Sequence, residues 1–325
     1  MNEIERLALE KVAPCDSSAL AALATVIEGE IPRMNFNSSW EFEQHLRGSK
    51  TPVILTNKMI EWPAMKLWNL EYFRETYGNV SLPASINLPD KGAVYDQANQ
   101  NHHQMMKLED IVDLIKQPNA KPCYTHQRPI SFFPSAERDV NFEEIVPPHP
   151  RHRPSINLWI GSKGTRSGLH FDRRDNLLGQ IQGQKWVLCC PPEERSKLNQ
   201  FRRNIDKSKI DVENMDLNKQ PQLKKVRMWH AILQPGELLF IPRMWWHFVR
   251  SLDPSISINF WFGPTAPWNE QIPAILSAGP LSLLVLTRDF IWNGILGRPH
   301  KTYLHTGRPS GAYYYDKIIG WRLKR

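Results

Sequence analysis

The chain has 325 residues, of which 41% are hydrophobic and 10% aromatic, and its formal net charge is +8. This composition excludes a disordered or fibrous chain, and the length is sufficient to bury a large core. The positive charge allows a nucleic-acid partner. Because the basic residues are spread along the chain, however, a solvated basic surface is favoured over RNA binding.

Three features bear on the compartment of the protein. Its four cysteines include no CxxC pair and do not form a disulfide framework, so we expect a reducing compartment and a cytoplasmic location. The N-terminal sequence MNEIERLALEKVAP shows no evident secretory signal. The most apolar segment, 272–292, is interrupted by prolines and charged residues, so it predicts a buried helix pair or a dimer surface and not a membrane span.

Helices dominate the predicted elements of the first third of the chain. Residues 1–28 carry apolar residues at helical spacing and predict one or two amphipathic helices. A short strand then precedes a Ser-capped helix from about Trp40 to Leu46, and TPVILTN predicts a buried strand. Two more helices follow, one in NLEYFRETYG ended by Gly78 and one in KLEDIVDLIKQP.

Short strands punctuated by Pro and Gly run from about 122 to 263, and the chain then becomes helical again. This order predicts a mainly β protein, a sandwich or jelly roll with flanking helices, and not an alternating β/α fold. Within it, LLGQIQGQKWVLCC predicts a hairpin that turns near Gly183. The charged segment 202–225 is long for a hairpin loop, and such loops are often functional or mobile.

The segment GLHFD contains the first candidate metal ligands. Side chains alternate between the faces of a strand, so His170 and Asp172 point the same way, although a structural His–Asp hydrogen bond is the default interpretation of this spacing. A second histidine, His247, ends QPGELLFIPRMWWH and could supply a third ligand from a neighbouring strand. Two histidines and one carboxylate on one face of a metal suit non-haem Fe(II) better than a closed structural zinc site.

A lysine adds a second element to this pattern. Lys185 lies in an apolar strand, and a buried ammonium is costly unless it meets a fixed anion such as a small dicarboxylate. Asn176 and Asn259 could help to orient that ligand. In SISINFWF, Asn259 and Trp261 share the polar face of the strand, which indicates an occupied cavity; a satisfied core amide is the alternative for Asn259 taken alone.

The segments SGLHFDRRDNLLGQIQGQK, PGELLFIPRMWWH and INFWF together resemble the JmjC, or cupin-like, Fe(II)/2-oxoglutarate oxygenases. The resemblance is greatest to the asparaginyl-hydroxylase branch and covers roughly residues 30–265. It implies a double-stranded β-helix, which is a jelly-roll core, as the catalytic domain of residues 30–265. An N-terminal helical extension (1–29) would precede it, and a C-terminal helical region (266–325) would follow as a possible homodimerisation element.

Carried over by position, the resemblance also implies the roles of individual residues. The iron ligands would be His170, Asp172 and His247. The residues that bind 2-oxoglutarate would be Tyr124, Ser167, Asn176, Lys185 and Asn259, with Ser167 standing where the family relative has a threonine. Gln180 and Trp261 would lie beside the metal.

The activity implied by the resemblance is that of a dioxygenase. It would use Fe(II), O2 and 2-oxoglutarate to hydroxylate a C–H bond of a protein or peptide side chain, with release of succinate and CO2. Three alternatives stay open: the same chemistry on tRNA or other RNA, hydroxylation of a small molecule or peptide natural product, and a cupin-like barrel that only binds a ligand. The complete ligand set with Lys185 argues against the last. The Asp ligand and the lack of a zinc-finger cysteine cluster favour a hydroxylase over a histone demethylase.

Other conspicuous residues have simpler interpretations. The pair His102-His103 is expected to be solvated, and Cys189 and Cys190 to be buried packing residues. One of Trp245 and Trp246 is expected in the core and the other at the mouth of the cavity, since neighbours on a strand point to opposite faces.

Overall fold

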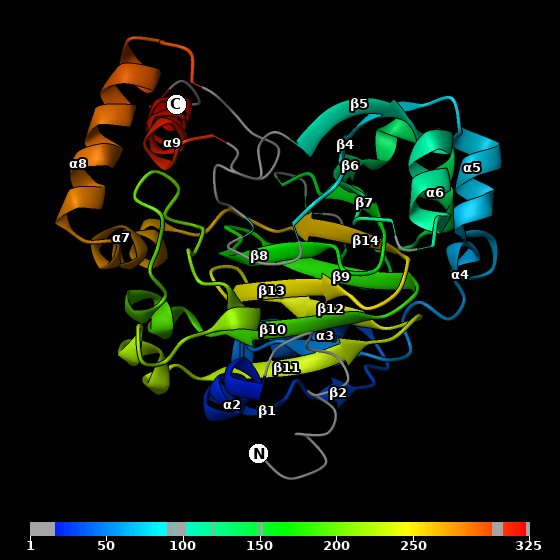
Figure 1. Cartoon of the computed structure of the whole chain (residues 1–325), viewed down its shortest axis with the longest axis horizontal. Helices are drawn as coiled ribbons and strands as arrows, with labels where there is room; N and C mark the ends of the chain where they lie inside the picture. Colours follow the sequence, from blue (N-terminus) through cyan, green and yellow to red (C-terminus); the bar gives the residue numbers. More distant parts are fainter. Residues whose placement is uncertain are drawn as a thin grey trace.

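The centre of the molecule consists of two β-sheets that face each other (Figure 1). The structure is a computed structural model that describes residues 17–89, 94, 102–118, 120–147, 149, 152–300 and 308–322. The strand order is β2-β3-β12-β9-β14-β7-β6-β4-β5 in the larger sheet and β1-β11-β10-β13-β8 in the smaller one. With helices on its flanks, this is the jelly-roll core that the sequence predicts.

The strands of each sheet come from distant parts of the chain. The larger sheet contains β2 (Arg33–Met34), β3 (Val53–Leu55), β4 (Ser81–Ser85), β5 (His103–Lys107), β6 (Tyr124–Pro129), β7 (Ser155–Gly161), β9 (Asp175–Gln182), β12 (Leu238–Ile241) and β14 (Ser255–Phe262). The smaller sheet contains β1 (Ile27–Glu30), β8 (Arg166–Phe171), β10 (Lys185–Cys190), β11 (Met228–Leu233) and β13 (Trp246–Ser251). Both sheets are mainly antiparallel, and β2–β3 and β1–β11 are parallel pairs.

Helices cover the outer faces of the two sheets. The α-helices are α2 (Ser17–Val26), α3 (Ser39–Gly48), α4 (Pro63–Leu67), α5 (Leu70–Tyr77), α6 (Leu108–Lys116), α7 (Trp268–Ser277), α8 (Pro280–Asp289) and α9 (Ser310–Arg322). The π-helix η7 (Phe290–Ile295) continues α8, and the 3-10 helices are η2 (Ile130–Phe132), η3 (Ala136–Asp139), η4 (Pro192–Lys197), η5 (Val212–Asn214) and η6 (Pro221–Lys225). Helices α3 to α6 pack on the larger sheet, whereas α2 and α7 contribute to the core under the smaller one.

Alternation along β10 separates two apolar layers. Trp186, Leu188 and Cys190 face outward into the core beneath α2 and α7. Val187 and Cys189 face inward, where they meet residues of the larger sheet. Both cysteines are fully buried, as predicted. Lys185 shares the inward face of the strand and is only 2% exposed.

The predicted hairpin around Gly183 is wrong. The chain does turn there, with a φ of +72°, but β9 pairs with β12 and β14 in one sheet while β10 pairs with β11 and β13 in the other. The turn therefore carries the chain between sheets. A Cβ atom at Gly183 would lie 2.5 Å from the Pro254 carbonyl oxygen, so glycine is required by space as well as by φ. Alternation predicts the faces of a strand but not the sheet to which it belongs.

The N-terminal elements largely follow the predictions. Ser38 caps α3, since its Oγ accepts a hydrogen bond from the Glu41 backbone N–H at 3.2 Å. Helix α5 ends at Tyr77, where a Cβ on Gly78 would lie 2.3 Å from the Arg74 carbonyl oxygen. The predicted helix within 1–28 ends at Val26 because β1 begins at once, and the part before residue 17 lies outside the described residues. Strands β4 and β5 were not predicted.

The C-terminal helices only partly match the expected buried helix pair. Their inner faces bury Ala274 and Leu286, but their outer faces leave Leu276, Leu284 and Trp292 exposed at 61%, 68% and 49%. Among the described residues, no single helix is long and apolar enough to cross a membrane. Helix α7 together with α8 and η7 would be long and apolar enough, but the two parts are bent by 117° relative to each other.

Candidate metal centre and the cleft above it

Two adjacent strands of the smaller sheet bring the predicted metal ligands together. His170 on β8 lies directly opposite His247 on β13, and their ring centroids are 4.2 Å apart. Asp172 follows the end of β8, and its Oδ2 is 3.7 Å from Nε2 of His247. One ligand atom of each residue lies within 4.8 Å of the others, so this group could hold a metal ion.

Backbone carbonyls fix both imidazole rings for metal binding. Nδ1 of His170 lies 2.7 Å from the Gly168 carbonyl oxygen, and Nδ1 of His247 lies 3.1 Å from that of Trp245. Because a carbonyl only accepts, each Nδ1 carries the hydrogen and each Nε2 keeps its lone pair. Burial and the neighbouring His247 hold the pKa of His170 well below its ordinary value, so this ring is neutral, the form that binds metals.

A chain of hydrogen bonds orients the Asp172 carboxylate. Trp261 donates through Nε1 to Oδ2 at 2.7 Å, and the Asn176 amide donates to the same oxygen at 3.3 Å. Asn176 in turn accepts from Asn259 at 3.0 Å, and Asn259 accepts from Trp159 Nε1 at 2.8 Å. Asn259 is therefore both a satisfied buried amide and part of the site, and the network leaves Oδ1 of Asp172 available for a metal.

Lys185 lies in the same cavity without an anionic partner. Its side chain is buried, and among the described residues no carboxylate is within ion-pair distance. Burial alone lowers the pKa of Lys185 from 10.5 to about 7. Its Nζ lies 5.9 Å from the ring centroid of Tyr124, and the Tyr124 hydroxyl hydrogen-bonds Ser167. Burial also raises the pKa of Tyr124, so the phenol is neutral.

The cavity between the sheets brings nearly all of the predicted site residues together. It is lined by His170, Asp172, His247, Tyr124, Ser167, Asn176, Lys185, Asn259 and Trp261, together with Trp159, Leu178, Ile241 and Val249. Polar groups thus converge within an otherwise apolar wall, which is typical of a small-molecule site.

Gln180 is the exception among the predicted residues. It is fully buried but does not line the cavity. Its amide donates to the carbonyl oxygens of Gln182 and Gly183 at 2.7 and 2.9 Å, and it accepts from Ser257 at 2.7 Å. Gln180 lies four residues beyond Asn176 on β9, too far along the strand to contact the ligands. The position predicted for it beside the metal is therefore wrong, and it stabilises the turn between the sheets instead.

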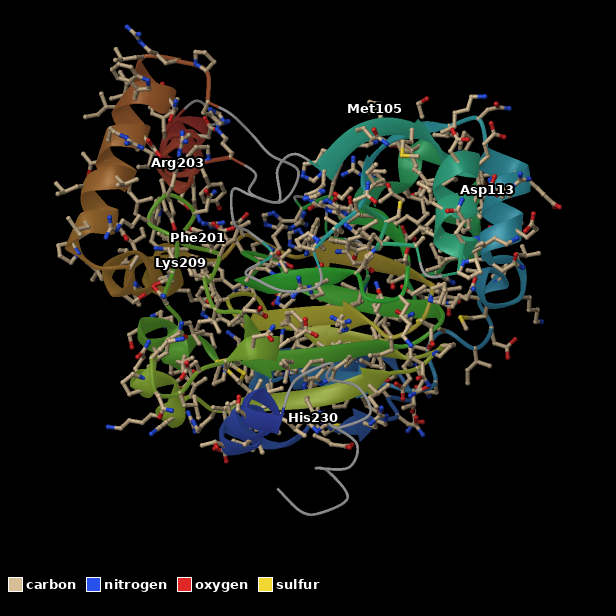
Figure 2. All side chains as sticks on the ribbon, viewed as in Figure 1. Met105, Asp113, Phe201, Arg203, Lys209 and His230 are labelled. Carbon is tan, nitrogen blue, oxygen red and sulfur yellow. The ribbon has the colours of Figure 1, made fainter. Side chains whose placement is uncertain are left out.

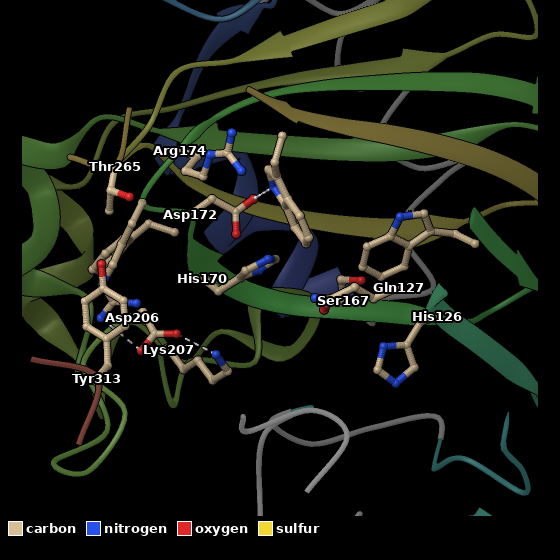
Figure 3. Close-up of a pocket in the computed structure, with 14 residues that line it drawn as sticks. His126, Gln127, Ser167, His170, Asp172, Arg174, Asp206, Lys207, Thr265 and Tyr313 are labelled. Carbon is tan, nitrogen blue, oxygen red and sulfur yellow. Dashed lines mark hydrogen bonds and ion pairs between the residues drawn. The ribbon is translucent and has the colours of Figure 1, made fainter. Parts of the chain in front are cut away.

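A wider cleft opens above the ligands and includes residues that sequence reasoning missed. Figure 3 shows His170 and Asp172 projecting into it, with Asp206, Lys207 and Tyr313 along one side and His126 and Gln127 on the other. Lys207 pairs with His170 across an isolated bridge, so segment 202–225 extends the smaller sheet at β8. The length and charge of segment 202–225 marked it in the sequence as a possible functional loop. No sequence pattern marked Trp159 or Tyr313.

Two simpler interpretations need correction. His103 is half-buried on β5, and its Nδ1 lies 2.8 Å from the Ser85 hydroxyl, so the pair with His102 is not simply solvated. Trp246 is in the core as expected, but Trp245 packs against Trp229, with ring centroids 6.4 Å apart, and is not among the described residues that line the metal cavity.

Comparison with known proteins places residues 39–266 in a family. The cupin-like domain family matches residues 39–266. The chain is 31% identical over 247 residues to lysine-specific demethylase 8 of Xenopus tropicalis, covering 74% of this chain and 55% of the relative. It is 30% identical over 220 residues to lysine-specific demethylase JMJ30 of Arabidopsis thaliana, covering 66% and 51%. It is 29% identical over 232 residues to human HSPB1-associated protein 1, covering 65% and 47%.

The chain spans about half the length of these relatives. None of the three is named as an asparaginyl hydroxylase, and placement in that branch stays a prediction. The family match covers most of the chain, and the metal-capable cavity lies within the matched region. The chain therefore belongs to the cupin-like, or JmjC, domain family.

Proposed function

We propose that this chain is an Fe(II)- and 2-oxoglutarate-dependent dioxygenase that hydroxylates a C–H bond of a protein or peptide side chain. The observation that carries the proposal is one cavity that holds His170, Asp172 and His247 together with the buried ammonium of Lys185, which pairs with no carboxylate in the described part of the chain. The donor set fits Fe(II), since two imidazoles and a carboxylate form a facial triad. The ammonium fits the carboxylate of 2-oxoglutarate that is distal to the metal.

Each part of the cavity has a distinct task. Bound Fe(II) and 2-oxoglutarate would supply O2 activation and oxidation of the substrate C–H bond, with release of succinate and CO2. Trp261 and Asn176 hold the carboxylate of Asp172 in a fixed orientation. Lys185 would pair with the distal carboxylate of 2-oxoglutarate, and the neutral Tyr124 phenol with Ser167 completes the polar end of the cavity. Leu178, Ile241 and Val249 exclude water from the other walls.

The names of the relatives support a protein substrate. Two of them are named lysine-specific demethylases, whose name refers to removal of methyl groups from lysine. None of the three relatives has a name that refers to RNA. The RNA alternative is therefore supported by the basic charge of the chain and not by these names. The domain limits at 29 and 265, the homodimer and the cytoplasmic location also stay predictions.

Turnover of 2-oxoglutarate tests the chemistry directly. The purified chain with Fe(II) and O2 is expected to form succinate, and Asp172→Ala is expected to lower this rate by about a thousandfold or more because a metal ligand is lost. Asp113→Ala is the matched control, since Asp113 is half-exposed and pairs with Arg74 on a distant helix surface. Full succinate formation by Asp172→Ala would reject the metal site.

The product identifies the reaction on the substrate. Mass spectrometry of extract proteins incubated with the loaded enzyme is expected to show peptides that gain one oxygen atom. Loss of a methyl group from lysine would instead show demethylation. If RNA or a small metabolite gains the oxygen while proteins stay unchanged, the proposed protein substrate is rejected. The proposed oxygenase activity would still stand.

A further inference from the structure

The strand that carries His170 lies at an edge of the smaller sheet. Among the described residues the strand order of that sheet ends at β8, which pairs there with β13 alone. An edge strand leaves a row of backbone N–H and C=O groups without a strand partner. Strand β8 therefore needs a further support if His170 is to stay at a fixed distance from His247 on β13.

Part of the long charged segment between β10 and β11 covers this free edge. The Phe171 N–H donates to the Asp206 carbonyl oxygen at 3.0 Å, and the Ser208 N–H donates to the Leu169 carbonyl oxygen at 2.9 Å. These two backbone hydrogen bonds lie on either side of His170. The segment therefore supports β8 at the residue that carries a candidate metal ligand.

Residues 204–213, which we call the strap, are fixed in turn on the C-terminal helices. The Ile205 N–H donates to the Ser310 hydroxyl at 3.2 Å, at the start of α9. Figure 2 shows Arg203 and Lys209, near the two ends of this turn, beside helices α7 to α9. The strap is therefore packed into the fold and can hold β8 in place.

A bulge interrupts the pairing of β8 with β13. His247 pairs with His170 and Val249 pairs with Ser167, so β8 advances by one residue more than β13 between the two pairs. The extra residue allows both Ser167 and His170 to face the cavity. Because a bulge disrupts the ladder locally, the two pairs need separate supports.

Two arginines pair with each other on the far side of this bulge. Arg166 on β8 lies directly opposite Arg250 on β13, and both side chains are largely buried. Like charges directly opposite one another destabilise a strand pair. The Glu213 carboxylate bridges them: it accepts from Arg166 Nη1 at 3.1 Å and from Arg250 Nη1 at 2.9 and 3.1 Å. One carboxylate of the strap, only 1% exposed, thus ties the two strands together.

We propose that Glu213 is a positioning residue for the metal centre, which fixes β8 against β13 so that His170 stays opposite His247. This inference rests on the metal site of the proposed function. Glu213 is not among the described residues that line the cavity, so it acts through the strands. The strap also supports β8 through its backbone at His170, and the two supports lie on opposite sides of the bulge. The long charged segment would thus serve the site from outside it.

Metal binding tests the proposal without relying on turnover. Mn²⁺ is the probe, because it resists oxidation better than Fe(II), and titration calorimetry of the full chain gives its Kd. Glu213→Ala is expected to raise this Kd about tenfold. The reason is that Arg250 loses the one carboxylate within ion-pair distance of it in the described part of the chain, so β8 can shift along β13. A folded Glu213→Ala variant with the wild-type Kd would overturn the proposal.

Glu194→Ala is the matched control. Glu194 is also a buried carboxylate with two cationic partners, but these partners, Lys197 and Arg227, lie outside β8 and β13. Its loss is expected to lower the free energy of unfolding and to leave the Kd for Mn²⁺ unchanged. If Glu194→Ala raises the Kd as much as Glu213→Ala does, general destabilisation and not positioning is responsible, and the proposal fails.

Hydrogen exchange locates the effect in the chain. Without metal, peptides that contain residues 166–171 are expected to exchange faster in Glu213→Ala, whereas those of β10 keep the wild-type rate. Unchanged exchange in β8 would contradict the proposed support. If Glu213→Ala does not fold, Glu213→Gln decides, since it keeps one accepting oxygen. Glu213→Gln is expected to raise the Kd for Mn²⁺, and a wild-type Kd would make Glu213 a residue of stability alone.

Two outcomes separate this inference from the proposed function. If the wild-type chain binds Mn²⁺ and forms succinate with Fe(II), but Glu213→Ala keeps the wild-type Kd, only this inference fails. If the wild-type chain binds Mn²⁺ but never consumes 2-oxoglutarate, the proposed dioxygenase fails. A raised Kd in Glu213→Ala would then still support the positioning role.

Discussion

The space between the two sheets has an apolar side and a polar side. On the apolar side, Ile54, Val187 and Leu239 pack with their neighbours and are fully buried. On the polar side, the candidate metal ligands and Lys185 surround a cavity. The same strands contribute to both, since the inward face of β10 carries Lys185 as well as Val187. Alternation along a strand therefore determines which residues face inward. An apolar residue at an inward position stabilises the fold, whereas a polar residue there contributes to the candidate site.

This division assigns opposite effects to substitutions on the two sides. On the apolar side, each buried side chain adds to the free energy of unfolding, and its loss leaves a cavity. On the polar side, an uncompensated buried charge lowers that free energy until a ligand neutralises it. Substitutions on each side test this difference.

Stability depends most strongly on the apolar side. Leu239→Ala is expected to lower the free energy of unfolding by about 2–5 kcal/mol, since Leu239 is fully buried between the sheets. Denaturant unfolding measures this change, and metal affinity of the folded variant is expected to stay at the wild-type value. A marked drop in metal affinity with little loss of stability would show that the two sides are not separate.

On the polar side, a substitution is expected to stabilise the fold and to weaken ligand binding. Lys185→Met removes the unpaired buried ammonium, so the free energy of unfolding without co-substrate is expected to rise by roughly 1–3 kcal/mol. The KM for 2-oxoglutarate is expected to rise about a hundredfold, because the charge that holds its distal carboxylate is lost. A destabilised variant with unchanged KM would make Lys185 a structural residue.

The smallest effect, taken per pH unit, is a pH dependence. Burial depresses the pKa of Lys185 from 10.5 to about 7, so the folded chain loses this proton above about pH 7 while the unfolded chain keeps it. The free energy of unfolding is therefore expected to rise with pH between about 7 and 10.5. Since the dicarboxylate binds the ammonium, its KM is expected to rise by up to about tenfold per pH unit above 7. Lys185→Met would abolish both slopes; slopes that persist in this variant would contradict the assignment.

Much of the fold and the site could be predicted because both depend on the period of two along a strand. This period placed His170 and Asp172 on one face and separated Asn259 from the apolar face of β14, which packs under the helices. The two histidines meet across neighbouring strands, and the family resemblance supplied that pairing, which spacing alone could not.

The remaining features depend on long-range packing. Trp159 and Tyr313 approach the site from β7 and α9, and no local pattern marks an aromatic residue as part of a distant cleft. Strand β4 contains Pro83, and the polar His103 begins β5, so neither segment resembles a buried strand. Lys207 lines the cleft because segment 200–209 pairs with β8, and its local sequence does not show this.

The turn at Gly183 determines where Lys185 lies. Two residues later the chain places Lys185 in the cavity, and any side chain at residue 183 would collide with the Pro254 carbonyl oxygen. Replacing one hydrogen by a methyl group there would displace the start of β10 and the ammonium it carries. This glycine therefore determines where the cavity lysine lies, although it does not itself line the cavity.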